Sequence, residues 1–287
     1  MLAIWTMWQA LIIMFIAMSM IPAGDTAGKL LSSAHEASPL YVAWSRFVIG
    51  SLIALPLVRA DTLRLMRDWR IWLRAMLLTG GITNIQFALQ TAPVADVFAA
   101  FFVGPIFSYV LSVVLLKERV TPLRSVLMAL GFIGVLLVVR PGFQASSGLG
   151  FALVAGLFYG AFLNASRWLS AVGRPGSLLF TQLFLSAVLM TPFCITLIPP
   201  LSGTMMTLTL ASAVFSMGGN FLLLFAYARA DATTLAPFVY FQLISAVILG
   251  WLVFHDLPDA VTIAGLCLII GAGLASALLN RRNVKVT

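Results

Sequence analysis

Residues Phe87 to Val139 read FALQTAPVADVFAAFFVGPIFSYVLSVVLLKERVTPLRSVLMALGFIGVLLVV. Two long apolar runs in this segment flank a short charged turn, Lys117-Glu118-Arg119. A helix needs about 20 mainly apolar residues to cross a bilayer, and each run has about that length. The segment therefore predicts two transmembrane helices joined by a turn.

The same pattern returns near the C-terminus, where residues Phe225 to Leu278 read FAYARADATTLAPFVYFQLISAVILGWLVFHDLPDAVTIAGLCLIIGAGLASAL. An offset of 138 residues places Gly80-Gly81 on Gly218-Gly219, Phe87-Ala88 on Phe225-Ala226, Ala92 on Ala230 and Glu118 on Asp256. Over the second span of each half the offset is 136, which places Pro39 on Pro175 and Pro56 on Pro192. The chain therefore contains a duplicated membrane unit.

The composition is that of a helical membrane protein. Of the 287 residues, 61% are hydrophobic and 9% are charged, and the mean hydropathy is +1.06. Soluble domains carry about 25% charged residues, so this chain has too few polar groups to cover a surface that faces water. The apolar runs are continuous rather than alternating, which favours helices over an outer-membrane barrel. We predict an all-α polytopic membrane protein.

Ten apolar runs are long enough to be transmembrane helices. They are residues 5–31, 40–58, 71–90, 95–116, 122–140, 149–168, 176–197, 204–227, 233–254 and 260–280. Each half has five, an odd number, so the halves must insert with opposite orientation. The loops agree, because the Arg-rich segment 59–74 corresponds to the uncharged segment 195–212. We predict two inverted five-helix repeats, residues 1–142 and 143–287, with a site near the midplane between them.

Basic residues gather on one face of the predicted bundle. They are Arg59, Arg64, Arg67, Arg70, Arg74, Lys117, Arg119, Arg124, Arg167, Arg174, Arg229, Arg281, Arg282 and Lys285. The bias of Lys and Arg toward cytoplasmic loops predicts that this face and both chain termini are cytoplasmic. The charges are spread thinly along one membrane rim, so the net charge of +8 does not indicate nucleic-acid binding.

The sequence lacks the patterns of an intramembrane enzyme or a metal site. Cys194 and Cys267 lie inside apolar runs, and His35 and His255 fall at the external rim. Neither H-E-x-x-H nor G-x-S-x-G occurs. We expect no catalytic residue, no metal and no cofactor. The intact repeat also disfavours a purely structural subunit.

Particular residues resemble the drug/metabolite transporter superfamily. They are Ala88-Leu89, Ala92, Pro105, Lys117-Glu118-Arg119-Val120-Thr121 and Gly134-Val135 in the first half, and Asp256, Gly265 and Gly273 in the second. The resemblance covers essentially the whole chain and is to the ten-helix exporters with EamA domains. It implies a central cavity lined by spans 1, 3, 4, 6, 8 and 9. Span two would close the outside and span seven the inside, with cytoplasmic termini.

Two branches of this superfamily bear on the substrate. The residues Asp25-Thr26-Ala27-Gly28-Lys29, Arg46, Ala230-Asp231-Ala232 and Ala236-Pro237 resemble the branch that contains S-adenosylmethionine carriers. The overall plan resembles bacterial exporters of aromatic and other neutral amino acids. Our main interpretation is export of neutral amino acids (aromatic, methionine, threonine-like) by alternating access. The alternative is an S-adenosylmethionine-type or other small-metabolite carrier.

Three charged residues lie inside the first two predicted spans. Asp25 and Lys29 are four residues apart and share one helical face, after Pro22, which can break or kink the helix. Arg46 lies in span two. A charge in a membrane costs about 3 kcal/mol or more, so such residues pair or line water. Either they anchor a zwitterionic substrate or relay protons, or they form a structural ion pair in which Asp25 or Lys29 meets Arg46.

Amide and aromatic side chains are the candidates for binding substrate. They are Asn84, Gln86, Phe102, Tyr159, Asn220, Tyr240 and Gln242. An amide in a membrane either bonds across helices or faces a cavity, and aromatic faces suit an amphipathic or aromatic solute. The alternatives are rings that face lipid and glycine pairs that only permit close packing.

The expected partners are a small-molecule substrate and membrane lipids, without nucleic acid. We expect a monomer, with a dimer left open, in the inner membrane of a bacterium. The direction of transport, proton coupling and the identity of the substrate stay open at this point.

Overall fold

The computed structural model describes residues 2–116, 122–139, 147–169, 171–200, 202–227 and 239–284. The first half of the chain supplies α1 (Leu2–Ala34), α2 (Pro39–Ile53), α3 (Ala60–Leu65), α4 (Trp69–Thr91), α5 (Val94–Phe101), α6 (Val103–Leu116) and α7 (Pro122–Val139). The second half supplies α8 (Ser147–Trp168), α9 (Pro175–Cys194), α10 (Gly203–Tyr227), α12 (Phe241–Phe254) and α13 (Ala260–Val284). The regular structure of these described residues is entirely helical, as the composition predicts.

The helices follow the predicted spans closely. The described residues contain all or part of each of the ten predicted spans. Span four is made of two helices, α5 and α6. By length and composition alone, four stretches could cross a membrane: Val94–Leu111, Gly148–Ser166, Pro175–Leu197 and Gly203–Leu223. Shorter apolar helices occupy Pro39–Ile53, Ser125–Val139, Phe241–Phe254 and Ala260–Ala275. Large apolar side chains are exposed on the outer helices, which suits contact with lipid.

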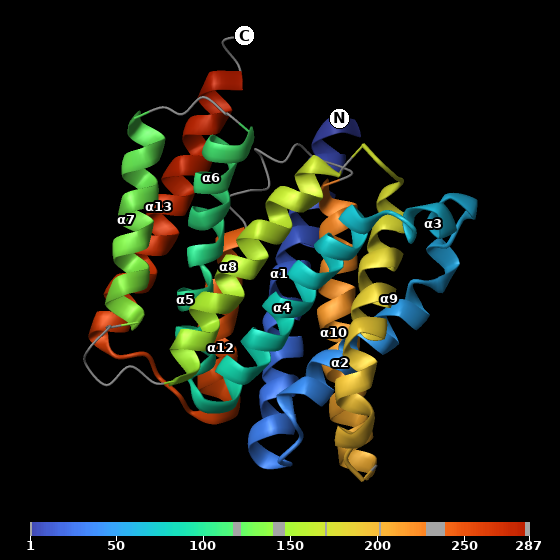
Figure 1. The fold of residues 1–287 in the computed structure, drawn as a ribbon. Helices are drawn as coiled ribbons and strands as arrows, with labels where there is room; N and C mark the ends of the chain where they lie inside the picture. The colour runs from blue at the N-terminus through green and yellow to red at the C-terminus, as the bar shows by residue number, and fades with distance from the viewer. Residues whose placement is uncertain are drawn as a thin grey trace.

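The two halves run in opposite directions (Figure 1). The start of α1 and the end of α13 lie at one end of the bundle, which we name the termini end; the opposite end is the far end. Helices α1 and α4 run toward the far end, whereas their counterparts α8 and α10 run toward the termini end. The proposed boundary between residues 142 and 143 lies outside the described residues, as do the 117–121 turn and residues 230–237.

Two local features differ from the sequence expectation. Helix α1 continues through Pro22 without a break. Span four is instead interrupted at Phe102, between α5 and α6. Pro105 explains the interruption, because it has no N–H to bond the carbonyl of the residue four positions earlier. A further short helix, α3, lies within the Arg-rich connection.

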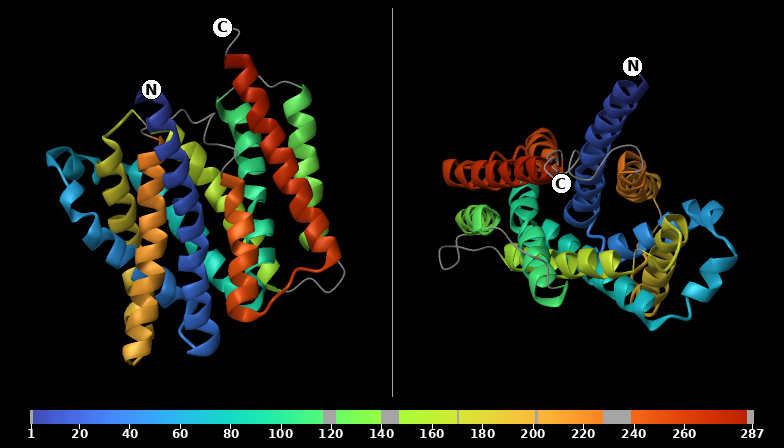
Figure 2. Two further views of the ribbon diagram at one scale, coloured as in Figure 1. Left: turned by 180° about the vertical axis from the view of Figure 1, so that it is seen from behind. Right: turned by 90° about the horizontal axis from the view of Figure 1, so that it is seen from above.

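Glycines bring helices of the two halves into close contact. A Cβ added to Gly219 in α10 would lie 2.7 Å from Ile21 of α1, and one added to Gly80 in α4 would lie 2.7 Å from the ring of Phe158 in α8. The glycine pairs thus serve close packing at equivalent places. Figure 2 shows α10 beside α1, and α13 beside α7.

The contacts around α4 and α10 differ between the halves. Helix α4 packs against both α1 and α2. The equivalent pairs in the second half, α8 with α10 and α9 with α10, make no comparably extensive contact among the described residues. The first-half contacts bring Asp25, Arg46 and Gln86 together.

Candidate functional site

A buried ion pair joins α1 to α2. Arg46 Nη1 donates to Asp25 Oδ1, and the two side chains are 5% and 6% exposed. Arg46 Nη2 donates to the carbonyl oxygen of Gly24 at 2.7 Å, and Nε donates to Ser212 Oγ of α10 at 2.8 Å. Buried charges are tolerated when the partner charge and the remaining donors are both bonded. All three nitrogens of this guanidinium have a partner.

Gln86 extends this group to α4. Its Nε2 donates to Asp25 Oδ1 at 3.1 Å. A Cβ added to Gly28 would lie 2.6 Å from both Arg46 Nη2 and Gln86 Oε1, so only glycine leaves room for both side chains. We name Asp25, Arg46, Gln86 and Ser212 the Asp25 cluster. It joins α1, α2 and α4 of the first half to α10 of the second.

Of the two residues that could meet Arg46, Asp25 does so, and Lys29 belongs to a different contact. Its Nζ donates to the carbonyl oxygen of Ala92 at 2.8 Å and to Asp256 Oδ2 at 3.4 Å, and it lies 4.6 Å from the ring centroid of Phe254. Ala92 ends α4, and Asp256 follows α12. The lysine reaches these groups because α1 packs against both helices. Lys29 therefore ties the two halves together near the far end.

Aromatic side chains form two separate contacts. The ring centroids of Phe102 and Tyr240 are 5.3 Å apart, which joins span four to the start of α12. Tyr159 of α8 lies 5.0 Å from Phe101 and 5.8 Å from Phe162. Such tilted ring pairs stabilise helix packing and also offer π faces to a solute.

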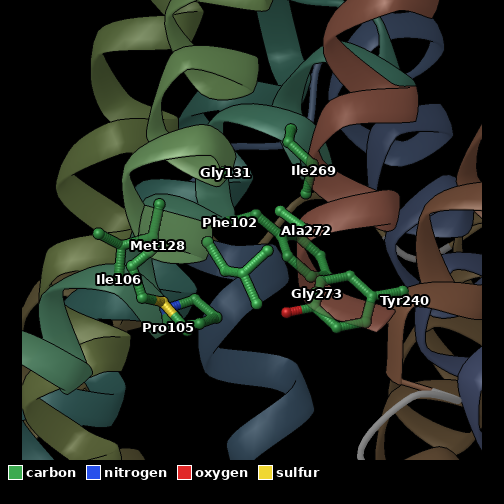
Figure 3. Close-up of a pocket in the computed structure, with 10 residues that line it drawn as sticks. Phe102, Pro105, Ile106, Met128, Gly131, Tyr240, Ile269, Ala272 and Gly273 are labelled. Carbon is green, nitrogen blue, oxygen red and sulfur yellow. The ribbon is translucent and has the colours of Figure 1, made fainter. Parts of the chain in front are cut away.

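Phe102 and Tyr240 also line a small pocket (Figure 3). The other lining residues are Pro105, Ile106, Leu127, Met128, Gly131, Ile269, Ala272 and Gly273. Its empty volume is about 310 Å³ when the space at its open mouth is counted. A Cβ at Gly273 would overlap the Tyr240 ring. The pocket reaches α7 and α13, so it shares only spans four and nine with the cavity that the superfamily resemblance implies.

The candidate amides do not gather at one place. Asn84 Nδ2 donates to the carbonyl oxygen of Gly80 at 2.8 Å, and Asn220 Nδ2 donates to that of Ser216 at 2.8 Å. Each bond stays within one helix, and the offset of 138 places the two asparagines two positions apart in the repeat. Gln242 is buried near the start of α12. Of the seven candidate binding residues, Gln86 belongs to the Asp25 cluster.

Sequence reasoning missed two polar partners. Ser212 and Asp256 lie 166 and 227 residues from the side chains that they bond, so local spacing gave no sign of either contact. The repeat places Asp256 on Glu118, which marks it as a charged residue at a span end but does not indicate that Lys29 is its partner. Among the described residues, no group of three His, Cys, Asp or Glu side chains could hold a metal ion. The Asp25 cluster and the Lys29 contact fix charges between helices of the two halves.

The sequence is similar to those of known transporters. It is 31% identical over 264 residues to the S-adenosylmethionine uptake transporter of Rickettsia bellii, covering 88% of this chain and 87% of that protein. It is 28% identical over 247 residues to the riboflavin transporter of Brucella anthropi, covering 81% and 86%. It is 28% identical over 244 residues to the pseudopaline exporter CntI of Pseudomonas aeruginosa, covering 82% and 84%.

The fold and the duplication also have counterparts. A crystal structure aligns with a TM-score of 0.65 and 20% identity, covering 96% of this chain and 98% of that chain, which bears on the fold alone. The sequence model of the EamA-like transporter family matches twice, at residues 5–140 and 146–277. The first match lies within residues 1–142 and the second within residues 143–287, the ranges predicted for the two repeats. The chain therefore belongs to the EamA-like transporter family, within the superfamily that its residues resemble.

Proposed function

We propose that this protein carries S-adenosylmethionine or a chemically similar metabolite across the bacterial inner membrane. The observation that carries the proposal is the 31% identity, over 88% of the chain, with a relative named for that substrate. Three further relatives with the same name are 28%, 30% and 29% identical. The riboflavin and pseudopaline relatives support the broader class of small metabolites. Amino-acid export, our main interpretation from the sequence, receives less support than this alternative.

The chemistry of the aromatic contacts supports a cationic, ring-containing substrate. S-adenosylmethionine combines an adenine ring, a sulfonium cation and an amino-acid group. The Phe101–Tyr159 and Phe102–Tyr240 pairs offer π faces that stack with a planar ring and attract a cation. We propose Asn84 and Gln242 as hydrogen-bonding groups for the rest of the molecule.

We further propose that the described conformation is closed at the far end. The Asp25 cluster and the Lys29 contact both bind α1 to α4 there, whereas α8 and α10 have no comparable junction among the described residues. Inverted-repeat carriers work by exchanging two such arrangements around a fixed site. Arg59, Arg64 and Arg67 are exposed beside α3, at the termini end (Figure 1). We infer from these charges that the termini end is cytoplasmic.

Counterflow in proteoliposomes tests the substrate. Vesicles that contain the purified protein are loaded with unlabelled S-adenosylmethionine, and uptake of the labelled compound is followed. Phenylalanine, methionine and riboflavin are tested in parallel, with protein-free vesicles as the control. We expect labelled S-adenosylmethionine to accumulate transiently above the protein-free level. Exchange of phenylalanine or methionine without exchange of S-adenosylmethionine would overturn this proposal in favour of amino-acid transport.

A further inference from the structure

Gln182 of α9 carries a buried acceptor without a partner. Its Oε1 is shielded from solvent and has no hydrogen bond. Two contacts with α4 flank it on the same face of α9, one helical turn away on either side. Leu178 accepts from Arg74 Nη1 at 3.0 Å, and Ser186 donates to the carbonyl oxygen of Ala75 at 3.3 Å. Buried polar atoms are nearly always hydrogen-bonded in native proteins, so the missing partner of Gln182 Oε1 needs an explanation.

Arg74 of α4 is a buried cation at the same helix seam. Its residue is 8% exposed, Nε donates to Ser166 Oγ at 2.8 Å, and Cζ lies 4.9 Å from the ring centroid of Phe162. In the described part of the chain, the arginines in ion pairs are Arg46 and Arg70, and no carboxylate pairs with Arg74. A guanidinium has five N–H donors, so Arg74 has donors left for another acceptor.

The repeat relates these two residues to a pair that is bonded. The offset of 136 in the second span places Arg46 on Gln182, and the offset of 138 in the third span places Arg74 on Ser212. At the far end, Arg46 Nε donates to Ser212 Oγ at 2.8 Å. Each pair therefore holds one arginine and one neutral acceptor, with the arginine on the second span in one pair and on the third span in the other.

We propose that Arg74 donates to Gln182 Oε1 when the termini end closes, as the counterpart of the Arg46–Ser212 bond. Arg74 would step from the carbonyl of Leu178 to the side chain of Gln182, one turn or about 5.4 Å along α9. The same transition would release Arg46 from Ser212 at the far end. This inference rests on the alternating-access part of the proposed function, but not on the identity of the substrate.

The test compares two substitutions with opposite expected effects. Spin labels at Val172 and Asn220, both exposed, report the distance between the end of α8 and α10 at the termini end without any substrate. Gln182→Glu gives Arg74 a charged acceptor and should raise the population with the short distance about fivefold or more. Gln182→Leu removes the acceptor and should lower that population by about fivefold, the usual worth of one net hydrogen bond. Gln90→Glu and Gln90→Leu, at an exposed glutamine of α4, are the matched controls.

A second background separates this bond from a general effect on packing. In an Arg74→Gln protein, Gln182→Glu should no longer raise the short-distance population, because the two residues couple only through their bond. The proposal fails if both Gln182 substitutions shift the distances in the same direction or neither shifts them. It also fails if the effect of Gln182→Glu survives in Arg74→Gln. Since no substrate is present, a negative S-adenosylmethionine exchange result would leave these outcomes unaffected.

Discussion

The α1–α4 junction and the α8–α10 junction are equivalent in the two repeats, yet they differ in chemistry. At the first, the buried Asp25 of α1, which is paired with Arg46 of α2, accepts from Gln86 of α4, and Lys29 of α1 donates to the carbonyl oxygen at the end of α4. At the second, α8 and α10 have no comparable contact among the described residues, and the nearby Arg74 is held without a carboxylate by α8 and α9. An inverted repeat need not place equal charges at its two ends.

The difference indicates how such a carrier can rest in one state. At the far end, Arg46 is bonded to both Asp25 and Ser212. At the termini end, Gln182 has an unbonded acceptor, and Arg74 has donors that are not used. A ligand shifts the equilibrium between the two conformations only by its difference in affinity for them. A junction that is too strong would therefore keep the carrier in one conformation even when substrate is bound. We propose that this inequality sets which end is closed when no substrate is bound.

The largest expected effect comes from breaking the charged junction. Asp25→Ala leaves Arg46 buried without its counter-charge and should lower the free energy of unfolding by about 3–5 kcal/mol. Arg74→Met removes a cation that has no carboxylate partner in the described part of the chain, and it should cost less. Thermal unfolding of the purified proteins in detergent measures both.

Removing both charges of the ion pair at once sharpens this test. Asp25→Leu combined with Arg46→Met removes both charges and should recover most of the stability, because a buried pair replaced by apolar residues is often neutral. If Asp25→Ala costs no more than Arg74→Met, the ion pair does not distinguish the two junctions.

A smaller effect is expected from filling the space at Gly28. A methyl group there would lie 2.6 Å from both Arg46 Nη2 and Gln86 Oε1. Gly28→Ala should therefore push the Arg46 and Gln86 side chains apart and lower the free energy of unfolding by about 1–3 kcal/mol. Gly271→Ala in α13 is the matched control, since nothing lies within 4 Å of its Cβ position. Equal melting temperatures for the two variants would show that the cluster tolerates displacement.

The smallest change in stability is expected at Lys29. The Asp256 side chain is 38% exposed, so solvent weakens the ion pair and Lys29→Met should cost about 1 kcal/mol or less. The rate of substrate exchange should nevertheless rise, because one tie between α1, α4 and the end of α12 is lost. Lys29→Arg should restore the rate of the unaltered protein. An unchanged exchange rate in Lys29→Met would remove Lys29 from the far-end junction.

The spans and their opposite orientation could be predicted from the sequence because both depend on local quantities. The length of an apolar run sets each helix, and the odd number of runs per half sets the inversion. The break at Phe102 was not predicted, because span four was taken as one continuous run, although Pro105 close behind it accounts for the break. The same rule allows Pro22 to break or kink its helix, and α1 continues past it without a break, packed by neighbouring helices.

The polar contacts could be predicted only in part. The pairing of Asp25 with Arg46 was one of the alternatives that the cost of buried charge leaves open. Lys29 was assigned to the same group because helical spacing shows which residues share a face, not which other helix that face meets. Its real partner, Asp256, is 227 residues away and depends on how α1 packs on the second half.

One measurement tests directly whether the two junctions alternate. One spin-label pair at Ala34 and Gln90 reports the far end, and another at Val172 and Asn220 reports the termini end; all four positions are exposed. Both distances are measured in proteoliposomes, with and without the substrate that counterflow identifies. We predict that substrate increases the population with a long far-end distance and the population with a short termini-end distance together. A substrate that shortens or lengthens both distances in parallel would contradict the account.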